Sequence, residues 1–512
     1  MPEIYRALIY ILAVSLPVLY VAQLALRSFV DPAELRIWRN CWFLGTCALF
    51  VSGSVLAYGL LILALSIYAH KSLSAPYNLF LVLLFTAPAI GVNVAIPGLI
   101  GSLIDLSPAR IFALAFLLPS AFLLFRKPRP PNRVMADTLF GVFILLLVVL
   151  SGRHGSLTYE LRAIAVIALD MVLPYYVFSR ALASIADVRR TLAAFIFAAL
   201  PFAATGAFEF VRGWRLYNTV IEQLGMELVQ PYLFRDGMLR ASVTAIEPIA
   251  FGFVCMVAIG FLLANKNLIR DRFLFPATLC IAGAGLAAGL SRGPWLGAAV
   301  LLLIVAAASR RGVLNIVKAS VAVGLICVPL LFTSAGERIV RLLPFVGSVD
   351  KDNEEYRTRL VDVSMNIVAR NPLFGSAQYR DAPELAEIIQ GQGIVDIVNT
   401  YVAIALEYGL VGLAAFLAIF LNIGLRLVGA SLRSDGEYAN LIRALAGTLV
   451  AIILTIGTVS SVSVIPYIYW ALAGLCVAAL RASHMVVVEA PDRPEPTMTV
   501  LGQPPLFGRV RG

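Results

Sequence analysis

The sequence predicts an all-α protein that crosses a membrane many times, and three observations lead to this fold class. The chain of 512 residues is 60% hydrophobic and only 14% charged, whereas roughly a quarter of a soluble domain is charged. Its apolar runs are continuous over about 20 residues, the length of a membrane-spanning helix. Its basic residues gather in alternate loops. Because lipid offers backbone groups no hydrogen-bond partner, spanning segments must be helices or a closed barrel, and unbroken runs favour helices.

We expect about 14 spans, within a range of about 12–14, from the lengths of these runs. The first run is long for a signal peptide and lacks a clear cleavage site of small residues, so we expect it to remain as a span. The third run is the weakest because it contains Pro88, Gly91, Asn93 and Pro97. The expected limits are 7–26, 41–69, 77–97, 109–125, 135–151, 161–179, 191–211, 244–264, 273–290, 294–309, 313–333, 397–425, 439–459 and 464–481.

The formal net charge of +10 indicates membrane orientation and contact with lipid headgroups rather than nucleic-acid binding. If the N-terminus is cytoplasmic, every basic cluster in a short loop falls on the cytoplasmic side. These clusters lie around residues 71, 126–133, 180–190, 266–272, 310–318, 426–433 and 481. The charge pattern therefore predicts that both termini are cytoplasmic.

The chain outside the membrane is concentrated in one long external loop. Residues 1–333 would form the first eleven helices, 334–396 the loop, 397–482 three further helices, and 483–512 a disordered cytoplasmic tail rich in proline. Apolar residues recur at helical spacing over 354–370, which predicts an amphipathic helix that Asn371-Pro372 ends. The six cysteines all fall within apolar runs, so we interpret them as packing thiols rather than a disulfide framework.

An arginine interrupts two apolar runs in the stretch GLSRGPWLG, residues 289–297. Arg292 would lie in an external loop, against the charge bias of the other loops. One interpretation is an anchor at the membrane interface, since a long cationic side chain can reach the headgroups at little cost. The alternative is a binding site for phosphate: Ser291, Gly293 and Pro294 make a tight non-helical turn, which is tolerated at this depth where it lines a polar cavity.

A second polar group lies in LRASVTAIEPIAFG, residues 239–252. Arg240 and Glu247 would lie at the external mouth of a span, and Pro248 fits the first helical position. The helix dipole stabilises a carboxylate at that place, which is one explanation for Glu247. The other is that Glu247 is a catalytic carboxylate at the rim of a cavity.

A third group opens the span in GIVDIVNTYVAIALEYGLVG, residues 393–412. On one helix, Asp396, Asn399 and Glu407 fall on a single stripe, with Glu407 about 16 Å below Asp396. An acid at that depth needs a cavity or a partner. The stripe would either form hydrogen bonds between helices or contribute Asp396 as a catalytic carboxylate and Asn399 and Tyr401 as substrate contacts.

Arg357 and Arg359 on the loop helix are either solvated charges or part of a basic mouth together with Arg240 and Arg292. The sequence contains no Walker loop, no GxSxG motif and no cluster with the spacing of metal ligands, so we expect neither nucleotide hydrolysis nor metal catalysis, and no cofactor.

Four motifs resemble the bacterial O-antigen ligase and Wzy-type polysaccharide polymerase superfamily, and they occur together and in the family's order along the chain, over about residues 235–425. The stretch LSRGPWLG resembles its SRG signature, and RASVTAIEPIAFG resembles its arginine segment that opens a span. RTRLVDVSMNIVARNPLFGS resembles the start of its long external loop helix, followed by NP-x-x-G. VNTYVAIALEYGLVGL resembles the segment that ends this loop, with its E-x-G-x-x-G pattern. Ligases of this superfamily usually carry a histidine where this chain has Val398. The sequence GIVDIVNTY, residues 393–401, looks more like the exopolysaccharide polymerases of the superfamily.

The resemblance implies a glycosyltransferase of the GT-C kind in the bacterial inner membrane, acting at the periplasmic face on glycans linked to undecaprenyl pyrophosphate. In the family, arginines hold the pyrophosphate, which maps by motif onto Arg240, Arg292 and Arg359. The other partners would be an acceptor glycan, the bilayer, a chain-length regulator and a flippase. Two rival functions remain. A ligase would pass the glycan to lipid A–core or a protein, and a transporter would move the lipid-linked glycan without making a bond.

Overall fold

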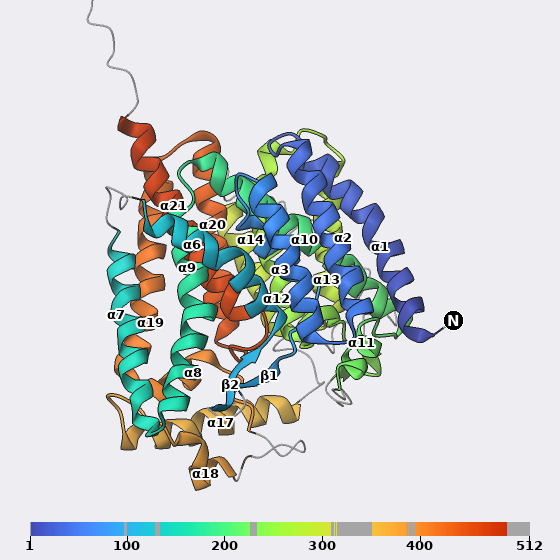
Figure 1. The fold of residues 1–512 in the computed structure, drawn as a ribbon. Coiled ribbons are helices and arrows are strands. Elements are labelled where there is room, and N and C mark those ends of the chain that lie inside the picture. Colours follow the sequence, from blue (N-terminus) through green and yellow to red (C-terminus); the bar gives the residue numbers. More distant parts are fainter. Residues whose placement is uncertain are drawn as a thin grey trace, which may run out of the picture.

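The structure is a computed structural model that describes residues 2–96, 100–127, 134–225, 233–308, 351–386 and 395–488, with Gly312, Leu314 and Ile388 as isolated positions. Apart from Leu314, the span expected at 313–333 lies outside these residues, and so does the tail beyond residue 488. In the described part, long helices run side by side and their loops gather at two opposite ends of the body (Figure 1).

Most of the long helices are continuous. They are α1 (Glu3–Leu26), α2 (Pro32–Ser52), α3 (Val55–Ser72), α7 (Met135–Ser151), α10 (Ile185–Arg212), α12 (Pro248–Ala264), α13 (Leu274–Ala288), α14 (Arg292–Ala307), α20 (Gly436–Ile456) and α21 (Ile465–Val488). Two others pass through a wide π-helical turn: α5 (Pro108–Phe112), η1 (Ala113–Leu117) and α6 (Leu118–Phe125); and α8 (Leu157–Ile167), η3 (Ala168–Val172) and α9 (Leu173–Arg180). The helix α19 (Thr400–Arg433) contains a break at Gly409.

The remaining elements are short or lie in loops. They are α4 (Asn78–Leu83), α11 (Asn218–Gln223), α17 (Lys351–Arg370), α18 (Pro383–Ala386), the antiparallel pair β1 (Val92–Ile96) and β2 (Ile100–Leu106), and the small hairpin β3 (Phe234–Arg235) and β4 (Met238–Leu239). In the β1–β2 pair, Val92 lies opposite Leu106 and Val94 opposite Ile104.

The predicted class of all-α polytopic membrane protein is confirmed. Among the described residues, nine helices are long and apolar enough to cross a membrane. Three shorter apolar helices, α12, α13 and α14, have 17, 15 and 16 residues. The most buried helices are α10, α12 and α21, which therefore form the centre of the body.

Two expected spans are wrong in their limits. The run at 41–69 is divided between α2 and α3 by Gly53, whose φ of 59° is in the left-handed region that favours glycine. The run at 77–97 forms only the six-residue helix α4 before the chain becomes extended as β1. Pro88 lies between these two elements and cannot donate a helical hydrogen bond, so the helix does not continue.

The two ends of the body can be told apart by their contacts. We call the end that carries α17 and the segments 233–247, 289–291 and 457–464 the loop end, and the end at which α21 finishes the tail end. The guanidinium of Arg6 lies 4.9 Å from the ring centre of Trp214, which follows α10 at the loop end. At the other end, Arg481 of α21 pairs with Asp137 at the start of α7. The first and last described helices therefore have their free ends on opposite sides (Figure 1).

In this arrangement the start of α1 and the end of α21 lie at opposite ends of the body, whereas the expected even number of spans would place them at the same end. The side of the membrane that each terminus faces stays a prediction. The division of 41–69 into two helices adds one crossing, so the start of α1 moves to the loop end. The beginning of α2 then lies at the tail end, where Glu34 is 3.6 Å from Arg190 at the start of α10.

Candidate functional site

Two arginines hold the turn that precedes α14. Arg240 is buried, with 6% of its surface exposed. Its Nη2 donates to Ser291 Oγ at 2.9 Å and its Nε donates to Gly289 O at 3.4 Å. Arg235 donates to the carbonyl of Leu290. The structure thus brings Arg240 to the turn that carries Arg292, two of the residues expected in a basic mouth. Arg292 is half-buried as the first residue of α14.

The segment 457–464 connects this turn to the other predicted residues. A Cβ added at Gly293 would lie 2.3 Å from Thr458 Oγ1, so only glycine fits beside Arg292. Ser463 Oγ donates to Ala245 O at 2.9 Å, two residues before Glu247. Ser460 Oγ donates to Asp396 Oδ1 at 2.7 Å. The sequence analysis missed this run of small hydroxyl residues, although four of them between two apolar helices were a usable signal.

The loop helix α17 begins over Asp396. Tyr356 donates its hydroxyl to Asp396 O at 2.9 Å. Burial, followed by the negative charge of Asp396, raises the pKa of Tyr356 above its ordinary value. Arg357 and Arg359 follow directly on this helix, the first half-buried and the second exposed. The predicted site residues therefore gather at the loop end, although no contact joins Arg359 to the others.

Strained backbone concentrates in the same loops. Among the described residues, the non-glycine residues with positive φ are Asp236, Val243, Ile246, Leu290 and Ser463. All of them lie in 233–247, 289–291 or 457–464. For β-branched residues such as Val243 and Ile246 this conformation is a genuine outlier, and such strain persists only where the surroundings over-determine it, often at functional sites.

A buried carboxylate holds one of these strained loops in place. Glu209 of α10 is 1% exposed and accepts three backbone N–H groups, from Leu216 at 2.9 Å, Val243 at 3.0 Å and Ser242 at 3.4 Å. The sequence analysis did not single it out. An acid in the last turn of a helix opposes the helix dipole, so its position was itself a sign of special partners.

Glu247 is the residue before α12, and Pro248 is at the first helical position, as expected. Its backbone is extended and its side chain makes no capping hydrogen bond. Its place at the start of α12 fits stabilisation by the helix dipole, and its role as a catalytic carboxylate stays a prediction. The side chain is half-buried near Ser463 and the Arg240 turn.

Asn399 and Tyr401 have roles within the fold. The Asn399 side chain caps α19 by accepting from Tyr401 N at 2.9 Å and Val402 N at 3.3 Å. The hydroxyl of Tyr401 donates to Ile453 O at 2.5 Å. The Asn399 contacts lie within α19 and only the Tyr401 contact joins two helices, so the interhelical interpretation of the stripe is not decided by them. A contact of either residue with substrate stays a prediction.

Glu407 does not lie deep in a straight span, as the helical stripe predicted. The break at Gly409 folds residues 400–408 back beside the rest of α19, so that the rings of Tyr401 and Phe416 lie 6.3 Å apart. Glu407 then lies at the loop end, close to Tyr379. The pKa of Tyr379 is raised above its ordinary value, first by the burial of this tyrosine and next by the negative charge of Glu407. The expected depth of about 16 Å assumed an unbroken helix.

The break is held by the NPLFG turn, residues 371–375. Leu410 N donates to Pro372 O at 2.8 Å, and Val411 N donates to Leu373 O at 3.1 Å. Gly375 and Gly409 both have positive φ and lie in direct contact, since a Cβ on Gly375 would be 2.6 Å from Gly409 N. Two of the recognised motifs thus interlock.

Arg153, which follows α7, fastens this contact. Its guanidinium donates to Phe374 O at 2.8 Å, to Gly375 O at 3.2 Å and to Glu407 O at 2.7 Å. It therefore ties the end of the long loop to α19, and the sequence analysis missed it because its partners are carbonyl groups of the backbone.

The comparison with known families supports this reading of the motifs. Residues 277–417 match the family model described as O-Antigen ligase. No curated protein matches the chain. The matched segment runs from α13 into α19 and contains the Arg292 turn, α17, Asp396 and the NPLFG contact. This match of residues 277–417 supports the resemblance to the O-antigen ligase and Wzy-type polymerase superfamily that the motifs predicted.

Proposed function

We propose that this protein is a polysaccharide polymerase that transfers glycan units from undecaprenyl pyrophosphate to the hydroxyl group of an acceptor glycan at the loop end. One observation carries the proposal: Arg240 is buried against the turn that presents Arg292, inside strained loops and within or beside the matched family region. A diphosphate is the ligand that two fixed guanidinium groups would suit.

We place the loop end in the periplasm. The basic residues Lys71, Arg126, Lys127, Arg190, Lys266 and Arg433 lie near the tail end, and the positive-inside rule assigns such residues to the cytoplasm. The added crossing also brings Arg27, Arg36 and Arg39 to the tail end, which strengthens the asymmetry. This orientation gives a periplasmic start of α1 and a cytoplasmic end of α21.

In the proposed reaction, an acceptor hydroxyl oxygen forms a bond to the anomeric carbon of the donor. The bond between that carbon and the pyrophosphate oxygen breaks, and the lipid pyrophosphate leaves. Arg240 and Arg292 stabilise the charge that develops on the leaving group. The proton of the hydroxyl goes to a carboxylate. Asp396, which is exposed and held by Ser460, and Glu247, which is half-buried, are the two candidates.

Polymerisation is preferred to ligation because Val398 occupies the place at which ligases of this superfamily usually carry a histidine. Transport without bond formation loses its main support. Carrier proteins place their binding sites near the middle of the membrane. Glu407 is the acid that an unbroken helix would place at such a depth, and it lies instead at the loop end.

The test is the length of the lipid-linked glycans in cells that carry Arg292→Ala. Loss of one such stabilising group should slow transfer about 10²–10³-fold while the amount of protein in the membrane stays at the wild-type level. For a polymerase, single repeat units then accumulate on the carrier in the periplasmic leaflet. Accumulated long chains would instead identify a ligase, units trapped in the cytoplasmic leaflet would identify a flippase, and normal polymer would contradict the site. Arg433→Ala at the tail end is the control.

A further inference from the structure

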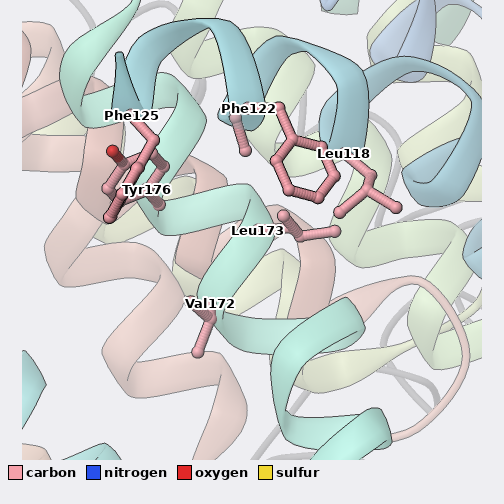
Figure 2. A pocket seen from close by; sticks show the side chains of 7 residues that line it. Leu118, Phe122, Phe125, Val172, Leu173 and Tyr176 are labelled. Atoms are coloured by element: carbon pink, nitrogen blue, oxygen red, sulfur yellow. The ribbon is translucent and has the colours of Figure 1, made fainter. Parts of the chain in front are cut away.

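An apolar groove lies between α6 and α9. These helices end in the half of the body nearer the tail end (Figure 1). Its volume is about 320 Å³ and it exposes no polar surface. Leu118, Phe122 and Phe125 line it from α6, and Leu173 and Tyr176 line it from α9 (Figure 2). Phe122 is 65% exposed and Phe125 is 80% exposed, so these rings project from the protein surface as two ribs beside the groove.

The groove follows from a short motif that occurs twice. The stretches ALAFLLP, residues 113–119, and ALDMVLP, residues 168–174, each form a π-helical turn followed by a proline. In each turn a leucine N–H donates five residues back, to Ala113 O and Ala168 O respectively. Pro119 and Pro174 have no N–H, so the regular ladder is interrupted at the same level in both helices. Such π-helical turns are rare in proteins as a whole, and those that occur often lie at functional sites.

Cationic residues lie at the ends of both helices that line the groove. Arg126 and Lys127 directly follow α6 and are exposed. The guanidinium of Arg180 lies 4.5 Å from the ring centre of Tyr176, which is one wall of the groove. Asp137 is shared by Arg180, at 3.8 Å, and by Arg481, so one carboxylate faces two arginines and the cluster is net positive.

An apolar groove with a positive end has the chemistry of a lipid with an acidic headgroup. Anionic lipids at a membrane surface attract lysine and arginine side chains. Each such cation strengthens the binding constant about fivefold. We propose that this groove binds one acyl chain of an anionic phospholipid, with the headgroup phosphate against Arg126, Lys127 and Arg180. The site lies in the opposite half of the body from the Arg240–Arg292 turn and is independent of the proposed transfer reaction.

The test is retention of lipid by the full-length protein in a non-ionic detergent. The protein is freed of lipid, incubated with phosphatidylglycerol or phosphatidylcholine, and weighed by native mass spectrometry. We expect phosphatidylglycerol to be retained in preference. Arg126→Gln with Lys127→Gln should weaken this retention about fivefold for each cation removed, and both residues are exposed, so the fold should be unaffected. Ala121→Trp, which fills the groove, should abolish the preference.

Matched controls separate the groove from the general lipid surface. Arg426→Gln with Arg433→Gln removes two exposed cations of α19 near the same end, and Leu60→Trp adds a ring to a lipid-facing position of α3 that is 69% exposed. Both controls should retain phosphatidylglycerol like the wild type. Equal retention of the two lipids, an equal loss in the control variants, or selective retention of an isoprenoid phosphate instead would each overturn the proposal.

Discussion

At the scale of single residues, the candidate site is assembled from side chains that act on the backbone of its loops. Arg240 donates to Ser291 Oγ and Gly289 O of the turn before Arg292, and Arg235 donates to Leu290 O. Glu209 accepts from three backbone N–H groups, two of them in the neighbouring segment 233–247. The sequence suggested Arg240 and Arg292 as members of one basic mouth. Glu209 and Arg153 could not be found in that way, because a bond to the backbone requires no particular residue in the partner segment and leaves no pattern of spacing.

Glu209 should be a positioning residue. Its removal in Glu209→Ala would leave three buried N–H groups without an acceptor, at about 1–3 kcal/mol each, and should lower both the thermal midpoint of unfolding and transfer. Glu209→Gln keeps one acceptor oxygen and should recover part of both. The measurement is polymer formed per amount of folded protein, with Glu222→Ala on the exposed face of α11 as the control. Equal activity in the alanine variant would remove Glu209 from the site.

The general base should be revealed by the pH dependence of transfer. A base must be deprotonated to act, so the rate should rise with pH through the pKa of the carboxylate that serves. Asp396→Asn and Glu247→Gln are to be compared over the same pH range. The variant that loses the acidic limb of the profile identifies the base. If both variants keep the wild-type profile, neither carboxylate has this role.

At the scale of elements, hydropathy predicted where apolar segments lie better than where they turn. The continuous run at 41–69 hides the turn at Gly53, because a single left-handed glycine is enough to reverse the chain and hardly changes the average hydropathy. The run at 77–97 contained two prolines, and there the local signals were correct. The break within α19 depends on a tertiary contact with the NPLFG turn, which no local pattern encodes.

That contact predicts a sharp difference between two glycines of α19. In Gly409→Ala a side chain is forced into the left-handed region, at about 1–2 kcal/mol, and its Cβ would approach Leu373 O to 2.3 Å. The loop should detach from α19, and limited proteolysis of the external side should cut it faster. Gly429→Ala, where the Cβ meets nothing within 4 Å, should be neutral or stabilising. Similar cleavage of the two variants would argue against the interlock.

At the scale of the whole molecule, the charge asymmetry was readable from the sequence, whereas the parity of crossings was not. A turn missed at Gly53 exchanges the two ends of the body for every expected segment before it and leaves the segments after it in place. The expected order of the external loop, the Arg292 turn and the basic loops is therefore unaffected, whereas the start of α1 lies at the other end of the body from the one that the expected spans give. A topology derived by counting spans is only as reliable as its least visible turn.

Labelling with a membrane-impermeant maleimide in intact cells with an opened outer membrane tests this topology. Glu3→Cys should react at once, because α1 starts at the loop end, and Asp435→Cys, between α19 and α20, should react only after lysis. Both should react in lysed membranes, which is the control. Protection of both cysteines in intact cells would restore a cytoplasmic N-terminus and exclude the separate α2 and α3 spans.

The contact between Gly375 and Gly409 has a consequence for the comparison of related sequences. A side chain on Gly375 would meet the backbone of residues 406–409, and a side chain on Gly409 would meet the backbone of Leu373 and Phe374. The contact between the two segments therefore requires both glycines. A relative that lacks the glycine of NP-x-x-G should also lack the glycine of E-x-G, even though the two motifs are more than thirty residues apart. The joint presence of the pair is therefore a search criterion for chains that fasten the external loop in this way, and its joint loss would mark a branch of the superfamily with a different closure.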